Sequence, residues 1–150
     1  MTLFTLVPWR SDWLWSLPLI VMTVVFHAYA LGLLSQGWSL LLKSAQYKRF
    51  PRTLSVFAVG GASLYATCLH GLEAAIWAIA YCLLGALGDR KGAMLYSISI
   101  MTTVGGSNLH LEPRWQLMGS LEALNGWILF GLTTAFLFAV IQKVWSLERP

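Results

Sequence analysis

Charged residues are scarce in this chain of 150 residues, in which Asp, Glu, Lys and Arg together make up 11% and hydrophobic residues 57%. No charged side chain occurs in the 30 residues between Asp12 and Lys43 or in the 20 residues between Glu122 and Lys143. Each run is long enough to cross the hydrocarbon layer of a membrane, which is about 30 Å thick. The composition therefore excludes a soluble domain and predicts an all-α integral membrane protein in a lipid bilayer.

Other classes of protein are excluded by what is missing. The only two cysteines, Cys68 and Cys82, lie in an apolar segment, where we expect buried free thiols rather than a disulfide framework or a redox motif. The ten Lys and Arg are too few for a nucleic-acid-binding protein, despite the net charge of +4. The first apolar run lacks the basic head and the cleavage site of a signal peptide. There is no arginine repeat for a voltage sensor, and after Trp145 we expect no cytoplasmic ligand-binding domain.

Three apolar stretches predict spanning helices, at about residues 13–34 and 54–87 and from about residue 115 to 145. Basic side chains gather in the loop of residues 43–52, which the positive-inside rule assigns to the cytoplasm. With this orientation six Lys and Arg lie inside and four outside. We therefore expect an outer N-terminus and a short cytoplasmic tail at residues 147–150.

Few polar side chains interrupt these stretches. For His27, near the middle of the first, a packed contact between helices is favoured over a functional site. His70 and Glu73 are three residues apart on one helical face and could bind a metal, share a proton or sense pH. We favour an ion pair or hydrogen bond between helices, because a metal site needs more than two ligands. The second stretch exceeds the membrane thickness, so it must tilt, protrude or break near Gly71.

A polar segment with two glycines, residues 101–108, interrupts a further charge-free run, Gly92 to Leu111. The helix predicted before it, Ala93 to Met101, is about 14–17 Å long, half the thickness of the hydrocarbon layer. Such a segment must enter the membrane and return on the same side. Irregular backbone at that depth is tolerated only when it is buried in protein or lines water.

These segments resemble the potassium-channel superfamily, in particular the small bacterial channels of the ion-channel pore family. Residues 96–105 (YSISIMTTVG) are similar to the pore helix and the start of the selectivity filter, and residues 125–135 (NGWILFGLTTA) to the inner helix around its hinge glycine. The resemblance implies that the helices of residues 1–87 precede a pore region at residues 88–146. It also implies a homotetramer in the bacterial inner (plasma) membrane, because each chain supplies one quarter of the pore. An enzyme, a soluble substrate and a cofactor other than the permeant cation are not expected.

The resemblance assigns roles to three sets of residues. The selectivity filter would comprise Thr102, Thr103, Val104, Gly105, Gly106, Ser107 and Asn108. The carbonyl groups of Thr103, Val104 and Gly105 would bind K⁺, or Na⁺, in place of its water shell. The cavity and gate would comprise Gly126 at the hinge, Phe130, Thr134, Phe138 and Gln142. The outer mouth would carry His110, Glu112 and Glu122.

Two of the mouth residues have alternative roles. A hydrogen bond from Glu122 to the backbone of the pore loop is favoured over a cation-gathering role, because an acid also suits the start of a helix. His110 either senses pH or is an incidental loop residue.

The second half of the filter departs from the family pattern. The family continues with tyrosine, glycine and aspartate, where this chain has Gly106, Ser107 and Asn108. Neither the packing of the tyrosine ring nor the aspartate charge is replaced. We therefore expect a K⁺-permeable channel of relaxed selectivity, and the alternative is a non-conducting pore-like scaffold or a subunit of a larger assembly.

Overall fold

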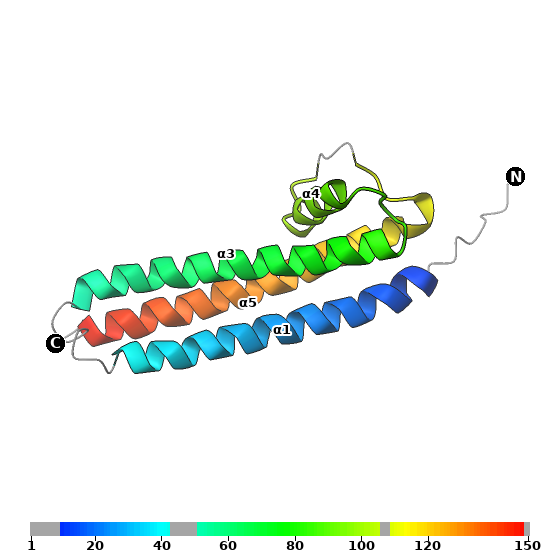
Figure 1. Cartoon of the computed structure of the whole chain (residues 1–150). Helices are drawn as coiled ribbons and strands as arrows, with labels where there is room; N and C mark the ends of the chain where they lie inside the picture. Colours follow the sequence, from blue (N-terminus) through cyan, green and yellow to red (C-terminus); the bar gives the residue numbers. More distant parts are fainter. Residues whose placement is uncertain (1–9, 43–50, 106–108, 149–150) are drawn as a thin grey trace, which may run out of the picture. The chain divides into compact units, whose positions relative to one another are not determined.

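The computed structural model describes residues 10–42, 51–105 and 109–148, and within these ranges all regular structure is helical (Figure 1). Four α-helices and one short 3₁₀ helix follow one another: α1 (Arg10–Leu42), α3 (Pro51–Leu83), α4 (Arg90–Met101), η1 (Pro113–Trp115) and α5 (Gln116–Glu148). Three of these segments are long and apolar enough to cross a membrane, namely Arg10–Gly37, Thr53–Leu83 and Pro113–Lys143. The all-α class and three helices able to span a membrane are thus confirmed.

The helix ends differ in part from those expected. Helix α1 begins at Arg10 rather than near residue 13 and continues past Leu34 to Leu42. No proline follows Pro18 in this helix, and its last three residues are leucines, which favour helix. Helix α3 begins at Pro51, as its fixed φ suits. It then runs unbroken through Gly71, so the long apolar stretch forms one helix rather than a broken one.

Helix α3 ends in a Schellman-type turn four residues earlier than expected. Gly85 has a positive φ of 65°, a conformation in which a side chain is unfavourable. The backbone N–H groups of Gly85 and Ala86 donate to the carbonyls of Cys82 and Tyr81, at 3.2 and 2.8 Å. This turn directs the chain into the short connection before α4.

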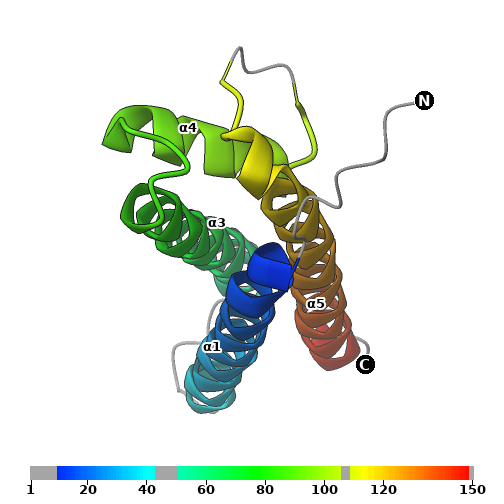
Figure 2. The ribbon, with the colours of Figure 1, turned by 90° about the vertical axis from the view of Figure 1, so that its right-hand side faces the viewer.

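The chain divides into two compact units. The first contains the described parts of Met1–Val24 and Gly71–Ile128, and the second those of Val25–His70 and Leu129–Pro150. The first unit includes α4, which lies beside the parts of α3 and α5 that belong to this unit (Figures 1 and 2). Its largest fully buried side chains include Trp77, Tyr81 and Met118. In the second unit, α1, α3 and α5 contribute the core residues Ala30, Leu31, Leu69, Leu132 and Phe136.

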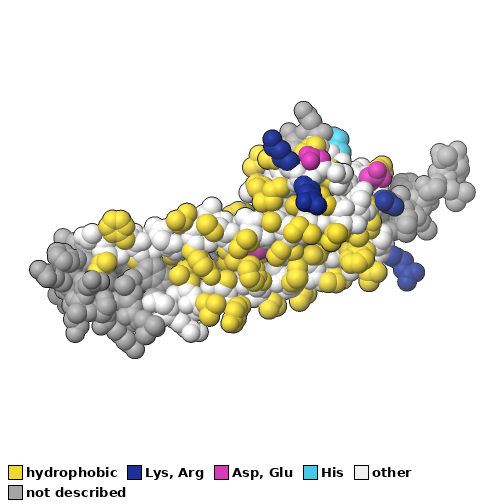
Figure 3. All heavy atoms as spheres, in the orientation of Figure 1, with side chains coloured by type: hydrophobic (Ala, Val, Ile, Leu, Met, Phe, Trp, Pro, Cys, Tyr) yellow, Lys and Arg dark blue, Asp and Glu magenta, His cyan; other side chains and the backbone are white. Residues whose placement is uncertain are grey.

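The surface of the helices is apolar. Exposed hydrophobic side chains occur on every long helix, among them Leu14, Phe57 and Trp127, each at least 70% exposed. Hydrophobic atoms cover much of the helical surface in Figure 3, and several of the charged groups in this view lie on α4. Cys68 is exposed on this surface, so the expectation of a buried thiol was wrong there. An outer surface of this kind suits a lipid environment or a partner helix rather than water.

Candidate functional site

Helix α4 starts at a well-formed cap. The Asp89 side chain accepts hydrogen bonds from the backbone N–H groups of Gly92 and Lys91, at 2.7 and 3.3 Å. Asp89 itself is extended, with φ −112° and ψ 126°, as is usual for a residue that caps a helix N-terminus. Asp89 is therefore the start signal of the short helix.

A buried carboxyl group joins α4 to two neighbouring helices. Glu122 of α5 is fully buried, and its two oxygens accept hydrogen bonds from the hydroxyls of Ser97 in α4 and Tyr81 in α3, the latter at 2.6 Å. The Ser97 hydroxyl also lies 2.8 Å from the Ala74 carbonyl oxygen of α3. The ring of Tyr96 packs edge-on against Tyr81, with 5.5 Å between their centroids. These contacts attach one face of α4 to both α3 and α5.

The position of Glu122 corrects the sequence-based expectation. This side chain does not face solvent at a mouth, and it accepts hydrogen bonds from two side-chain hydroxyls rather than from the backbone of the pore loop. The physical reason is burial, because a carboxyl group without water must be satisfied by nearby donors. Ser97 and Tyr81 supply them, and neither had been singled out from the sequence.

Two glycines of α5 allow α4 to approach closely. A Cβ atom on Gly119 would collide with the Tyr96 hydroxyl, and one on Gly126 would collide with the backbone carbonyl of Met101. Gly126, the expected hinge residue, is buried within an unbroken helix. Its observed role is to make room for the last turn of α4, immediately before the glycine-bearing loop.

The backbone after α4 turns its amide groups back toward the helix. The N–H of Thr103 donates to the Ile100 carbonyl at 2.9 Å, and those of Val104 and Gly105 both point to the Ser99 carbonyl, at 3.1 and 3.4 Å. Thr103 and Gly105 have positive φ angles of 56° and 62°. A positive φ is rare for a β-branched residue, so Thr103 is held in a strained conformation.

The carbonyl groups of this loop consequently point the other way. In a trans peptide the C=O lies opposite the N–H of the next residue, and the described residues contain no cis peptide. The carbonyls of Thr102, Thr103 and Val104 are therefore directed away from the last turn of α4. All three residues are exposed, and Val104 is 78% exposed. Gly106, Ser107 and Asn108, the atypical part of the expected filter, lie outside the described residues.

The other expected pore residues are distributed along α5 and the loop before it. Phe130, Thr134, Phe138 and Gln142 are all exposed, at steps of four residues along one side of the helix. His110 and Glu112 are exposed as well. Of the three residues expected at the mouth, His110 and Glu112 are thus exposed, whereas Glu122 is buried.

A second polar cluster lies in the second unit. The Nε2 atoms of His27 in α1 and His70 in α3 lie 2.9 and 3.1 Å from the same hydroxyl, that of Thr133 in α5. His27 is fully buried, and His70 is half-buried and stacked on Phe130 with 4.4 Å between ring centroids. The expected contact of His27 between helices is confirmed. The sequence did not indicate that His70 is its neighbour.

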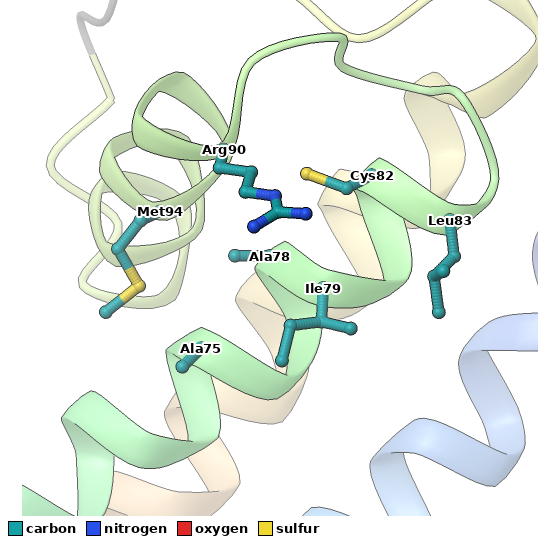
Figure 4. Close-up of a pocket in the computed structure, with 7 residues that line it drawn as sticks. All are labelled: Ala75, Ala78, Ile79, Cys82, Leu83, Arg90 and Met94. Atoms are coloured by element: carbon teal, nitrogen blue, oxygen red, sulfur yellow. The ribbon is translucent and has the colours of Figure 1, made fainter.

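A shallow pocket of about 330 Å³ lies where α4 approaches α3. Figure 4 shows Arg90 of α4 extending over Ala78 and toward Cys82 of α3, with Met94 closing one side. The other lining residues are Ala75, Ile79 and Leu83. The lining of this pocket is small and apolar apart from the Arg90 guanidinium and the free thiol of Cys82.

Comparison with known proteins finds no family model, no curated protein and no solved structure that matches this chain.

Proposed function

We propose that this chain is the pore-forming subunit of a tetrameric cation channel, permeable to K⁺ with relaxed selectivity. In this proposal α4 and the loop after it re-enter the membrane, and four copies of the loop surround the ion path. The observation that carries the proposal is the row of outward-directed carbonyls at Thr102, Thr103 and Val104. The N–H group on the other side of each of these peptide bonds points back to α4. Rings of backbone carbonyls are what replaces the water shell of a cation in a selectivity filter.

The length and attachment of α4 support the same proposal. Its 12 residues extend about 18 Å, too short to cross a hydrocarbon layer of about 30 Å. Its cap at Asp89 and its polar attachment to Glu122 hold it against α3 and α5. A short helix held at its side and start by buried contacts can position the loop that follows its end. Irregular backbone within a membrane needs such support.

Relaxed selectivity follows from the second half of the loop. Gly106 has no ring to pack against the pore helix, and Asn108 has no charge. The ion-binding groups are then the carbonyls that begin at Thr103, with Val104 and Gly105 next, and the outer half is less constrained in width. Both K⁺ and Na⁺ should therefore pass, with a preference for K⁺.

Reconstituted protein under opposed K⁺ and Na⁺ gradients tests the proposal directly. The expected reversal potential lies between zero and the value for a purely K⁺-selective pore. The matched substitutions are Gly105→Ala and Gly85→Ala, since both glycines have a positive φ, of 62° and 65°, and both have open space around a new Cβ. Each should destabilise the fold by about 1–2 kcal/mol, but only Gly105→Ala should alter the current.

Absence of conductance under every gradient, with correctly folded tetramers, would contradict the channel proposal. Replacing Gly106, Ser107 and Asn108 by tyrosine, glycine and aspartate then separates two explanations. A gain of K⁺ current would show a competent pore frame with an inactive filter. No gain would favour the non-conducting scaffold.

A further inference from the structure

The pocket between α3 and α4 has two walls, each formed by one face of a helix. The α3 wall consists of residues spaced three or four apart and their neighbours, namely Ala75, Ala78, Ile79, Cys82 and Leu83. Arg90 and Met94, four residues apart, form the α4 wall (Figure 4). From residue 75 to residue 82 the α3 wall extends about 10 Å. All of these residues belong to Gly71–Ile128, so the pocket lies within the first compact unit.

Arg90 brings an uncompensated positive charge to this pocket. None of the described residues that line the pocket is acidic. Asp89, the neighbouring acid, accepts instead from the backbone N–H groups of Lys91 and Gly92. No hydrogen bond or ion pair joins the guanidinium to another described residue. The five N–H donors of an exposed guanidinium suit a phosphate group, which can accept two parallel hydrogen bonds.

The apolar part of the pocket lies at the end of a segment long enough to span a membrane. Its α3 wall falls entirely within the candidate span Thr53–Leu83. With this span in a bilayer, Cys82 would lie where α3 leaves the hydrocarbon layer, and Ala75 about 10 Å deeper. Arg90 extends toward Cys82 (Figure 4). The charge is therefore placed for a lipid headgroup, and the apolar wall for an acyl chain.

We propose that this pocket binds one anionic phospholipid per chain, with the phosphate on Arg90 and one acyl chain along the α3 wall. A cation without a nearby acid favours a headgroup of net negative charge, because a zwitterionic headgroup brings a second cation close to the guanidinium. The volume of about 330 Å³ is at the lower end for a small-molecule site, so it accommodates part of a lipid while the rest lies in the bilayer.

A lipid in this position would contact both α3 and α4, and would add to the contacts that attach α4 to its neighbours. Glu122 provides such an attachment through Ser97, from the α5 side. The lipid site is separate from the loop after α4, and it would exist whether or not the protein conducts ions.

The test is lipid binding to the full chain, purified in a non-ionic detergent and titrated with phosphatidylglycerol or with phosphatidylcholine of the same acyl chains. Native mass spectrometry counts the lipids retained per chain. We expect one phosphatidylglycerol per chain, bound about 5-fold tighter than phosphatidylcholine, the size of effect that one basic residue has on anionic lipid. Glycerol phosphate, which has the charge but no acyl chain, should not displace the bound lipid.

Matched variants separate the charged part of the site from the apolar part. Arg90→Gln should abolish the preference for phosphatidylglycerol. Arg114→Gln should keep it, because Arg114 is also exposed but lies over the Trp115 ring, with 5.6 Å to its centroid, and does not line the pocket. Ala75→Leu should fill the apolar end and weaken binding of both lipids. Ala80→Leu, also half-buried on α3 but outside the pocket, should not.

Equal binding of the two lipids by the unaltered protein would overturn the proposal, and this comparison needs no variant to fold. The proposal is also overturned if Arg90→Gln keeps the preference or if Arg114→Gln loses it. Lipid bound by single chains but not by an oligomer would show that a second copy covers the pocket, which is equally incompatible with a lipid site.

Discussion

The two buried polar clusters, one in each unit, have different chemistry although both join three helices. In the first, one carboxyl group accepts hydrogen bonds from two hydroxyls, those of Ser97 and Tyr81. In the second, one hydroxyl is shared by the imidazoles of His27 and His70. The first therefore centres on an acceptor surrounded by donors. The second centres on a small polar group shared by two imidazole rings.

Because of this difference, the first cluster holds its helices by fixed hydrogen bonds, whereas the second contains a hydrogen bond that can be replaced. Glu122 has a hydroxyl on each of its two oxygens, so the cluster is a fixed joint between α4, α3 and α5. The Thr133 hydroxyl has one proton and can donate to only one of the two rings at a time while it accepts from the other. A shared hydroxyl is thus a replaceable link between the helices.

The largest effect should come from Glu122→Ala. It removes the partner of the buried Tyr81 hydroxyl and one partner of Ser97, so we expect the free energy of unfolding to fall by about 3 kcal/mol. Thermal or denaturant unfolding in detergent measures this. Glu112→Ala is the control, because this acid is exposed and its loss should change stability by no more than about 0.5 kcal/mol. Equal effects of the two substitutions would show that the first cluster is not a structural joint.

A smaller loss should follow Gly126→Ala. The new Cβ would meet the Met101 backbone carbonyl, which cannot rotate away as a side chain can, and overpacking of this kind costs about 2 kcal/mol. Gly131→Ala in the same helix has open space around the added methyl group and should be neutral or slightly stabilising. Unfolding of the two variants measured side by side tests the difference. If Gly126→Ala were as stable as Gly131→Ala, the close approach of α4 to α5 would be contradicted.

The smallest effect should come from Thr133→Val, which removes the hydroxyl shared by His27 and His70. We expect a loss of about 1 kcal/mol, because a buried hydrogen-bonding group is removed from both rings. Thr134→Val is the neighbouring control, since that hydroxyl is exposed and bonds only to the Phe130 carbonyl of its own helix, at 2.8 Å. Thermal or denaturant unfolding compares them. A loss as large as that of Glu122→Ala would remove the distinction between the two clusters.

The long helices could be predicted because charge is absent from them. The runs bounded by Asp12, Lys43, Glu122 and Lys143 indicated where α1 and α5 lie, and the apolar stretch of residues 54–87 indicated α3. The short helix before the glycines was also predicted, from its length and from the break after Met101. Local composition is enough to predict that a helix is present, and a single sequence provides it.

The contacts between helices could not be predicted in the same way. In a membrane protein both the lipid-facing and the inward-facing sides of a helix are apolar, so the pattern does not indicate which residues meet. For this reason His27 was not linked to His70, and Ser97 was not linked to Glu122. The motif suggested a hinge at Gly126, but it did not indicate that this glycine packs against the Met101 carbonyl. These contacts depend on how the helices are aligned with one another. The spacing of residues along a single helix does not determine that alignment.

The contacts between α1 and α5 also have a consequence for synthesis. Asp12 accepts a hydrogen bond from the Met118 backbone N–H at 3.1 Å, and Asn125 donates to the Thr23 hydroxyl at 2.9 Å. These partners are 106 and 102 residues apart in the chain, and His27 and Thr133 are likewise 106 apart. At about 5–20 residues per second, a ribosome needs roughly 5–20 s to make the second partner after the first. During that interval the polar groups of α1 need other partners, so these contacts form only after α5 has been synthesised.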